Sequence, residues 1–331
     1  MERFVFVTAI VVASIFALGA LFGKPLENGW GFHFNADDDG YRTADLVELA
    51  AAAAPAQNYQ ATSIRLRHVA ARVVVTPEDR ADVSIEIDNP GGAPMPLATL
   101  ENGRLTVNGQ LRGRIGECTD EGVELRGYGF TPYERMPLIT IRAPRQLDLT
   151  FTGAGRAEIG PSSELDLDVN GCAAADVGEV SGDMEVAVNG SGQVVVAGGQ
   201  EANLDLNGSG RLRVENVRAG AEAEVNGSGG ITIANLTGSL TLDNRGSGSL
   251  EVLAGAVTNA DIELFGSGQV TVAAPTERLV VQIFGSGDVD VPAAVGALEA
   301  EIFGSGDVSV QSVSGEVRQQ ARGSGSVRIG Q

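Results

Sequence analysis

The chain has 331 residues, of which 43% are hydrophobic, only 5% are aromatic and 45 are glycine. This length can hold one large or two ordinary domains, and the composition requires an aliphatic core. The formal charge is −20, from 43 acidic and 23 basic residues. This balance argues against binding to nucleic acid or to an anionic lipid surface, because contacts to phosphates require clustered Lys and Arg.

Residues 1–23 contain an uncharged apolar run from Phe4 to Gly23. Such a run predicts export, either as a cleaved signal peptide or as a retained anchor, because about 20 apolar residues also suffice to span a bilayer. The small residues Ala17 and Gly19 would suit cleavage before Ala20. We expect an exported protein, periplasmic or associated with the cell envelope, that meets the membrane only through this segment.

Residues 24–61 are acidic and rich in alanine, and they predict a tether with one short helix beginning near Asp45. Residues 62–150 then contain five irregular apolar stretches that we expect to be strands. Because a stack of β-coils exposes unpaired backbone groups at its end, we interpret residues 62–150 as less regular coils that cap the stack. The five stretches are Ile64–Leu66, Val73–Val75, Val83–Ile87, Leu105–Val107 and Leu138–Ile141.

Residues 151–331 repeat the triplet Gly-Ser-Gly at spacings of 18 to 20 residues. Two degenerate copies, at Gly153 and Gly171, precede eight clear ones. The residues four and two before each first glycine are almost always apolar, as are those four and six after it, with polar residues between them. This alternation predicts two strands joined at each triplet, with both glycines facing inward and the serine outward. The clear copies begin at Gly190, Gly208, Gly227, Gly246, Gly266, Gly285, Gly304 and Gly323.

One such coil cannot bury its own apolar face, so neighbouring coils must stack in register at about 4.8 Å. The sequence therefore predicts an all-β fold, a single-chain β-solenoid of about ten coils with a less regular N-terminal β cap. Differences of one residue in coil length would be absorbed at a second, more variable corner of each coil.

Stacking would place the residues that precede the triplets in one row along the solenoid. The row begins with four asparagines, whose amides can hydrogen-bond along the axis. After Arg245 it continues with three phenylalanines, whose rings can stack. The asparagines are Asn170, Asn189, Asn207 and Asn226, and the phenylalanines are Phe265, Phe284 and Phe303. If no loop covers it, the phenylalanine row is an apolar stripe of the kind that marks an interface, and we take it as a candidate binding surface.

The only two cysteines, Cys118 and Cys172, would meet an oxidising compartment after export. Pairing is the ordinary outcome for two thiols in such a compartment, so we expect a disulfide between them. A metal site is not expected at these cysteines, because only His33 and His68 could join them as soft ligands. We also expect no cofactor.

The repeated strand Gly-Ser-Gly-x-Val-x-Val, preceded by Leu-x-Leu or Val-x-Val, resembles the bacterial auto-transporter adhesin head GIN domain family over roughly residues 62–331. The stretch from Ile141 to Gly153 is similar to that family's entry into its glycine coils, whereas the literal Gly-Ile-Asn motif is absent. The resemblance implies a right-handed β-helix of the cell envelope. It brings no catalytic residues.

Catalysis is not expected from the triplets. No Lys-Ser or Lys-Thr follows them, as a phosphate loop would require, and two histidines cannot serve eight serines. Asp288 and Asp307 share one coil position, however, and a separation of one rung approximates the ~5 Å between the carboxylates of a retaining glycosidase. A carbohydrate-active site at these aspartates, with the phenylalanine row as its sugar platform, is therefore the alternative function.

A second acidic row also follows from the spacing, and like charges on neighbouring rungs repel one another. Either solvent and neighbouring arginines or a calcium ion would relieve this repulsion. The row consists of Asp205, Glu224, Asp243 and Glu263.

These observations favour a non-catalytic, adhesin-like binding or structural module of the cell envelope. Its expected partner is an envelope glycan or protein. Besides the carbohydrate-active alternative, an anchored scaffolding or sensory ectodomain remains open. The first alternative would require a groove beside the aspartates, and the second an N-terminal segment that stays in the membrane.

Overall fold

The computed structural model describes residues 51–330. The expected export segment, and the expected helix where it precedes residue 51, lie outside these residues. Within residues 51–330 the chain forms twenty-four β-strands and one short 3-10 helix. The described part of the chain contains no helix of the length and apolarity needed to cross a membrane.

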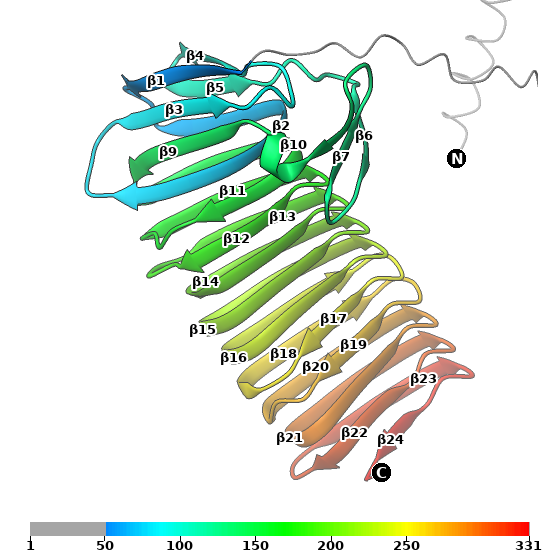
Figure 1. The fold of residues 1–331 in the computed structure, drawn as a ribbon. Coiled ribbons are helices and arrows are strands. Elements are labelled where there is room, and N and C mark those ends of the chain that lie inside the picture. Colours follow the sequence, from blue (N-terminus) through cyan, green and yellow to red (C-terminus); the bar gives the residue numbers. More distant parts are fainter. Residues whose placement is uncertain (1–50, 331) are drawn as a thin grey trace, which may run out of the picture. The chain divides into compact units, whose positions relative to one another are not determined.

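The first nine strands and the 3-10 helix precede the regular coils (Figure 1). They are β1 (Ala52–Tyr59), β2 (Ser63–Glu78), β3 (Val83–Asn89), β4 (Leu97–Glu101), β5 (Arg104–Asn108), β6 (Ile115–Cys118), β7 (Gly122–Leu125), β8 (Gly129–Pro132), η1 (Tyr133–Arg135) and β9 (Leu138–Pro144).

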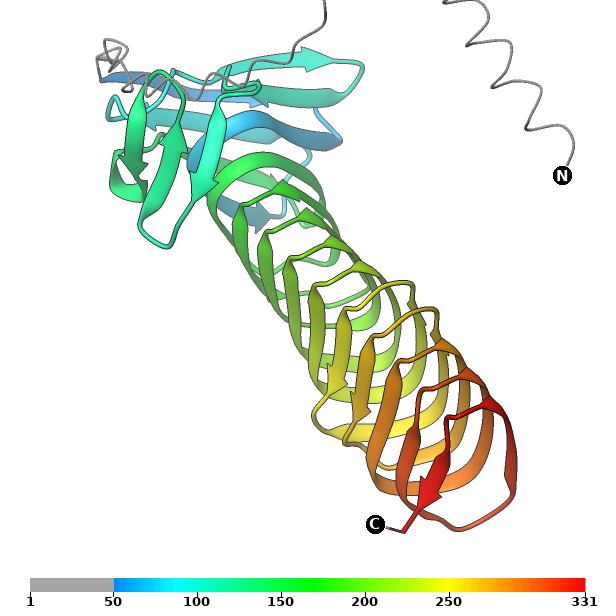
Figure 2. The ribbon, with the colours of Figure 1, turned by 90° about the vertical axis from the view of Figure 1, so that its right-hand side faces the viewer.

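The remaining strands form the regular coils, which Figure 2 shows stacked one behind another around a common interior. They are β10 (Gln146–Ile159), β11 (Glu164–Gly171), β12 (Ala174–Glu179), β13 (Met184–Gly190), β14 (Gln193–Gly208), β15 (Arg211–Gly227), β16 (Gly230–Asn244), β17 (Ser249–Val252), β18 (Gly255–Leu264), β19 (Gln269–Val272), β20 (Thr276–Gly285), β21 (Asp288–Gly304), β22 (Val308–Val313), β23 (Val317–Gly323) and β24 (Val327–Ile329).

Each regular coil pairs in parallel with the next, and identical positions of the repeat face one another. Asn189 lies opposite Asn207 in the pairing of β13 with β14, and Phe284 lies opposite Phe303 in the pairing of β20 with β21. The register shifts only at the variable corner, for example between Gly238 and Ser239. The predicted β-solenoid of about ten coils, with length variation absorbed at that corner, is confirmed.

The interior is one continuous aliphatic cluster that runs through all the regular coils. Leu206 and Val214, on the two sides of one triplet, are both 0% exposed. Burying a side chain of this kind contributes roughly 1.5–3 kcal/mol, and every coil repeats the contribution. The apolar positions of the repeat are thus the core, as the alternation predicts.

The two glycines of a triplet play different roles, which corrects the expectation that both face inward. Gly210, the third residue of its triplet, is buried, and a Cβ there would lie 2.6 Å from the carbonyl oxygen of Gly192. Gly208, the first residue, has φ +127°, and a Cβ there would lie 2.4 Å from the carbonyl oxygen of Gly190. The first glycine therefore serves the bend itself, because its backbone conformation and the close contact to the preceding rung both exclude a side chain.

The N-terminal end is closed by strands that leave the solenoid pattern. β2 pairs in parallel with β10 on one side and with β5 and β9 on the other, whereas β3 pairs antiparallel with β9, and β4 antiparallel with β5. The sequence predicts only irregular coils here, because its apolar stretches do not reveal strand direction. The antiparallel strands provide the covering layer that an open stack requires.

β1 corrects the extent of the expected tether. Residues 52–59 form a strand that pairs antiparallel with β3, so the folded region begins before residue 62. Tyr59, at the end of β1, packs against the main core. Alanine-rich sequence has no strong strand preference, and it is this pairing with β3 that makes the segment extended.

A separate three-stranded antiparallel sheet, β6–β7–β8, lies over the first coils and has its own small core. Val123 and Leu125 are 0% exposed in that core. The expected disulfide is present, and it joins Cys118 at the end of β6 to Cys172 just after β11, with a Cα–Cα distance of 6.4 Å. The sheet is therefore fastened covalently to the solenoid.

Candidate binding face

One face of the solenoid carries nearly all the side-chain rows that the sequence singles out. Four outward positions of each coil, one, three, five and seven residues before the first glycine, form rows along the axis. We call this the ladder face. It is built by β10, β11, β13, β14, β15, β16, β18, β20, β21 and β23.

The asparagine row occupies the first of these positions in the N-terminal coils. Asn207 donates to Oδ1 of Asn189 at 3.0 Å, and Asn226 donates to Oδ1 of Asn207 at 3.1 Å. Asn170 lies opposite Asn189 in the register, but among the described residues no side chain or backbone group hydrogen-bonds to its amide. The amide ladder is thus formed over three rungs and open at Asn170.

The phenylalanine row occupies the same position in the C-terminal coils. The ring centroids of Phe265 and Phe284 are 5.0 Å apart, those of Phe284 and Phe303 are 5.1 Å apart, and the rings are parallel within 5° and 3°. The guanidinium of Arg322 covers the far side of Phe303. The rows predicted from the sequence are therefore both present in the structure.

The stack changes what the phenylalanines can bind. Phe265 and Phe284 remain 40% and 39% exposed, but each ring face between rungs is covered by the next ring. Sugars stack on aromatic faces, so this row is no platform for a pyranose ring. What it presents to solvent is a ribbon of ring edges, which carry the positive end of the ring quadrupole.

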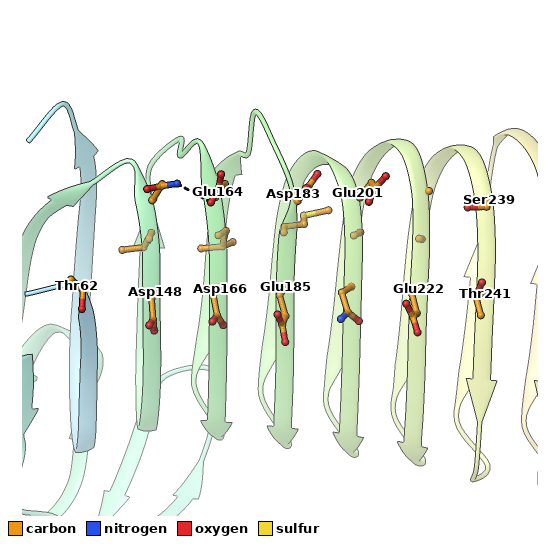
Figure 3. Close-up of a pocket in the computed structure, with 18 residues that line it drawn as sticks. Thr62, Asp148, Glu164, Asp166, Asp183, Glu185, Glu201, Glu222, Ser239 and Thr241 are labelled. Atoms are coloured by element: carbon orange, nitrogen blue, oxygen red, sulfur yellow. Dashed lines mark hydrogen bonds between the residues drawn. The ribbon is translucent and has the colours of Figure 1, made fainter. Parts of the chain in front are cut away.

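A groove of about 800 Å³ runs along the N-terminal half of the ladder face (Figure 3). Figure 3 shows two rows of its side chains on successive strands. One row contains Asp148, Asp166, Glu185 and Glu222, with Asn203 between the two glutamates; the other contains Glu164, Asp183 and Glu201. No arginine, lysine or histidine lines the groove, but the charges of Arg104 and Arg65 partly offset the rise in the pKa of Asp148, so the least compensated carboxylates are those from Asp166 onward.

Four carboxyls of this face hold their protons more tightly than free carboxyls do. Burial, followed by the neighbouring charge of Asp168, raises the pKa of Asp166. Burial and then the charge of Asp166 raise the pKa of Asp148 and of Glu185. In the adjacent row, burial and then Glu224 raise the pKa of Asp205. These carboxylates would be stabilised by any donor or cation placed among them.

The acidic row expected from the spacing is also in register, and arginine relieves part of its repulsion. Arg245 pairs with Asp243 and lies 3.7 Å from Glu224. Among residues 51–330, no three Asp, Glu, His or Cys side chains are arranged to hold a metal ion. Arg245 thus relieves part of the repulsion between stacked carboxylates for which calcium was the alternative explanation.

Asp288 and Asp307 do share a coil position, but they lie beyond the glycine bend, outside the ladder face. Oδ1 of Asp288 accepts from the backbone N–H of Asp307 at 2.9 Å. Oδ1 of Asp307 accepts from the backbone N–H and the hydroxyl of Ser326, and its Oδ2 accepts from Arg328. These contacts, led by the Ser326 hydroxyl, lower the pKa of Asp307. Both carboxylates are thus hydrogen-bonded to the next rung, and Asp307 with its lowered pKa does not suit the role of general acid, so these contacts disfavour the glycosidase alternative.

Two features of the face escape sequence reasoning. Asn244 stands in a core position of the repeat and is 1% exposed, with its amide donating to the carbonyl of Gly248 at 2.8 Å. A pocket of about 530 Å³ lies beside the open end of the asparagine ladder, under the segment that follows β5. Asn244 can be seen in the sequence as a polar residue at an apolar position. The pocket cannot, because it forms where the segment after β5 crosses the glycine bends, and no sequence pattern predicts that crossing.

The family model described as "Putative auto-transporter adhesin, head GIN domain" matches residues 179–311. The resemblance that the repeat indicates is therefore confirmed over these coils. No curated protein matches the sequence. The disulfide is typical of proteins from oxidising, extracytoplasmic compartments and agrees with export.

Solved structures to which the chain is similar include a "putative adhesin" from Parabacteroides distasonis ATCC 8503, with 16% identity and a TM-score of 0.43. Another "putative adhesin", from Parabacteroides merdae ATCC 43184, has 18% identity and a TM-score of 0.40. A "Putative lipid binding protein" from Parabacteroides distasonis ATCC 8503 has 17% identity and a TM-score of 0.37. In each case 83% of this chain and 95% of the other chain are covered. Likenesses at this level carry no conclusion about the ligand.

Proposed function

We propose that the protein is a non-catalytic, adhesin-like binding module of the cell envelope that holds a polymer along the groove of its ladder face. The observation that carries this proposal is the row of Asp148, Asp166 and Glu185, repeated on successive rungs and without a basic partner among the groove residues. The adhesin description of the matching family agrees with a binding role. Export through the N-terminal segment would deliver the module to the envelope.

The groove favours a glycan that carries amino groups. Carboxylates accept hydrogen bonds from hydroxyls and form charge-assisted bonds with ammonium groups. The rung spacing of about 4.8 Å is close to the length of one sugar residue in an extended polysaccharide, so successive residues would meet successive carboxylates. An extended peptide advances two residues in about 6.6 Å and matches the rungs less well.

A titration of the full-length protein with a glucosamine oligomer tests the proposal. We expect saturable binding that weakens as salt is added, because the contacts are ionic and exposed. The double variant Asp166→Asn, Glu185→Gln should bind about tenfold more weakly, since it removes charge-assisted hydrogen bonds contributing about 1.5 kcal/mol or more.

The matched control is Glu316→Gln, which removes a carboxylate of the same face outside the groove, where Glu316 accepts from Arg318 at 2.9 Å. The affinity of this variant for the glucosamine oligomer should equal that of the wild type. Equal affinity for all three proteins would overturn the groove as the site. Tighter binding of an oligolysine of the same charge would replace the glycan with a basic protein partner.

A further inference from the structure

The pocket beside the open end of the asparagine ladder is a second, chemically different site. Its floor is the first glycine bends of the solenoid, and its wall is the segment that crosses them between β5 and β6. The lining residues that bear on binding are His68, Leu111, Ile115, Thr152, Asn170 and Cys172. A volume of about 530 Å³ lies in the range of small-molecule sites.

The wall of this pocket is fixed in place. The backbone N–H of Leu111 donates to the carbonyl of His68 at 3.1 Å, and Leu111 is only 1% exposed. His68 itself has φ +50°, a conformation that few non-glycine residues adopt. On the other side the disulfide from Cys118 holds Cys172. A preformed pocket of this kind loses little entropy on binding.

The polar groups of the pocket are incompletely hydrogen-bonded. Asn170 and Thr152 continue the asparagine row beyond Asn189, but within residues 51–330 neither side chain has a protein hydrogen-bond partner. A bound amide would extend the ladder by donating its N–H to Oδ1 of Asn170, as Asn207 donates to Asn189. The partly buried side chain of Ile115 supplies an apolar contact within the same pocket, backed by the buried Leu111.

Two arginines adjoin the pocket without lining it: Arg67 precedes the lining residue His68, and Arg112 lies between the lining residues Leu111 and Gly113. The pocket lining contains no aspartate or glutamate. Nε of Arg67 donates to Nε2 of His68 at 3.1 Å. Burial first, and then the charges of Arg67 and Arg112, lower the pKa of His68, so the imidazole is neutral while the two guanidinium groups stand close to it. A carboxylate on a ligand would meet these two arginines.

We propose that this pocket binds an acidic N-acetylated amino sugar, with its acetamido group on Asn170 and its carboxylate toward Arg67 and Arg112. The amide, the methyl group and the carboxylate of such a sugar correspond to the open ladder, the apolar contact at Ile115 and the two arginines. An amide of a peptide shares the first feature only. This site is separate from the acidic groove, which repels a carboxylate.

Calorimetric titration of the full-length protein with N-acetylmuramic acid tests the proposal. N-acetylglucosamine lacks the carboxylate and muramic acid lacks the acetyl group, so we expect both to bind about tenfold more weakly, in line with the loss of one charge-assisted or one amide contact. Asn170→Leu should weaken the binding of N-acetylmuramic acid by a similar factor. Arg112→Gln should bind N-acetylmuramic acid no more tightly than N-acetylglucosamine.

Asn226→Leu is the matched control, because Asn226 belongs to the same ladder but not to the pocket. It should leave the affinity unchanged, and both leucine variants should still bind the glucosamine oligomer in the groove. Equal affinity of wild type and Asn170→Leu, or no binding of N-acetylmuramic acid by a protein that binds in the groove, would overturn the pocket site. Tighter binding of N-acetylasparagine amide than of the sugar would overturn the sugar assignment.

Discussion

The two halves of the ladder face have the same backbone and different outward chemistry. From β11 to β15 the row before the triplet is asparagine and the adjacent rows are acidic, whereas from β18 to β21 the row is phenylalanine. Both halves keep the parallel register and the glycine bend. The comparison teaches that the inward positions and the glycines specify the coil, which leaves the outward rows free to specify what it binds.

The coil between the two halves differs from both of them. There Asn244 replaces the apolar residue of the core, and its Oδ1 accepts from the backbone N–H of Gly246 at 3.1 Å. The neighbouring Arg245 stands in the row between Asn226 and Phe265. The amide of Asn244 thus hydrogen-bonds the glycine bend in the coil where the outward row changes from asparagine to phenylalanine.

The largest expected effect tests whether the bend is common to both halves. Gly208→Ala and Gly285→Ala should each destabilise the fold by about 3 kcal/mol, because both glycines have positive φ and a Cβ would lie 2.4 Å and 2.2 Å from the carbonyl oxygen of the preceding rung. Denaturant unfolding measures the loss. Gly230→Ala is the control, because its nearest neighbour is the movable hydroxyl of Ser249 at 3.0 Å. A large loss in one half only would break the comparison.

The next effect concerns the junction. Asn244→Leu should destabilise by about 2 kcal/mol despite its greater hydrophobicity, since it removes the acceptor of the Gly246 N–H and one of the two donors to the carbonyl of Gly248, which keeps only the N–H of Gln269. The same unfolding experiment on Leu242→Met, one core position away, should show a smaller loss. A more stable Asn244→Leu protein would mean that the junction rung is an ordinary rung.

Truncation of the outer rows should separate the two halves. Phe284→Ala removes two ring contacts and should cost about 1.5 kcal/mol, whereas Asn207→Ala removes two exposed amide bonds and should cost less than about 1 kcal/mol. Thermal unfolding of the two variants side by side measures the difference. Phe284→Ala should also leave binding of the glucosamine oligomer unchanged, and a loss there would place the ligand on the ring edges instead.

The smallest effect is a pH dependence with opposite signs at two aspartates. The pKa of Asp166 is raised by folding, so its protonation favours the folded state: this contribution is present below the ordinary carboxyl pKa near 4 and is lost as the pH rises through the raised value. Asp166→Asn should therefore stabilise slightly at neutral pH, by less than about 1 kcal/mol, and not at acid pH.

Asp307 is the matched control, because its pKa is lowered by folding. Its contribution is present above the ordinary carboxyl pKa and is lost as the pH falls through the lowered value. Asp307→Asn should therefore destabilise at neutral pH. Unfolding midpoints of both variants and the wild type are measured between pH 3 and pH 7. If both variants shift the midpoint in the same direction relative to the wild type at neutral pH, the assignment of the two environments is contradicted.

The sequence predicted the repeating part of the structure well, because the period, the alternation and the register are local properties of each coil. It thereby identified the inward residues, the stacking of Phe265 on Phe284, and the asparagine row. It also predicted the disulfide of Cys118, since the chain has only one other cysteine.

What the sequence could not supply depends on direction and on crossings between distant segments. Strand direction decides that β3 runs antiparallel to β9, and no residue pattern encodes it. The pocket at Asn170 exists because the segment around Leu111 crosses a bend formed some sixty residues later. The ring stack was foreseen, but its consequence, that the faces of Phe284 are covered, follows only from the measured geometry.

Carboxyl footprinting of the full-length protein, with and without the glucosamine oligomer, tests most directly whether the ligand occupies the acidic half of the ladder face. Esterification of Asp and Glu by a diazo compound, which spares the amino groups of the oligomer, is read out by mass spectrometry of peptides. The proposed binding mode predicts slower labelling of Asp166, Glu185 and Glu222 when the oligomer is bound, with no change at Glu299 and Glu316. Protection of the latter two alone, or of none of the five, would contradict it.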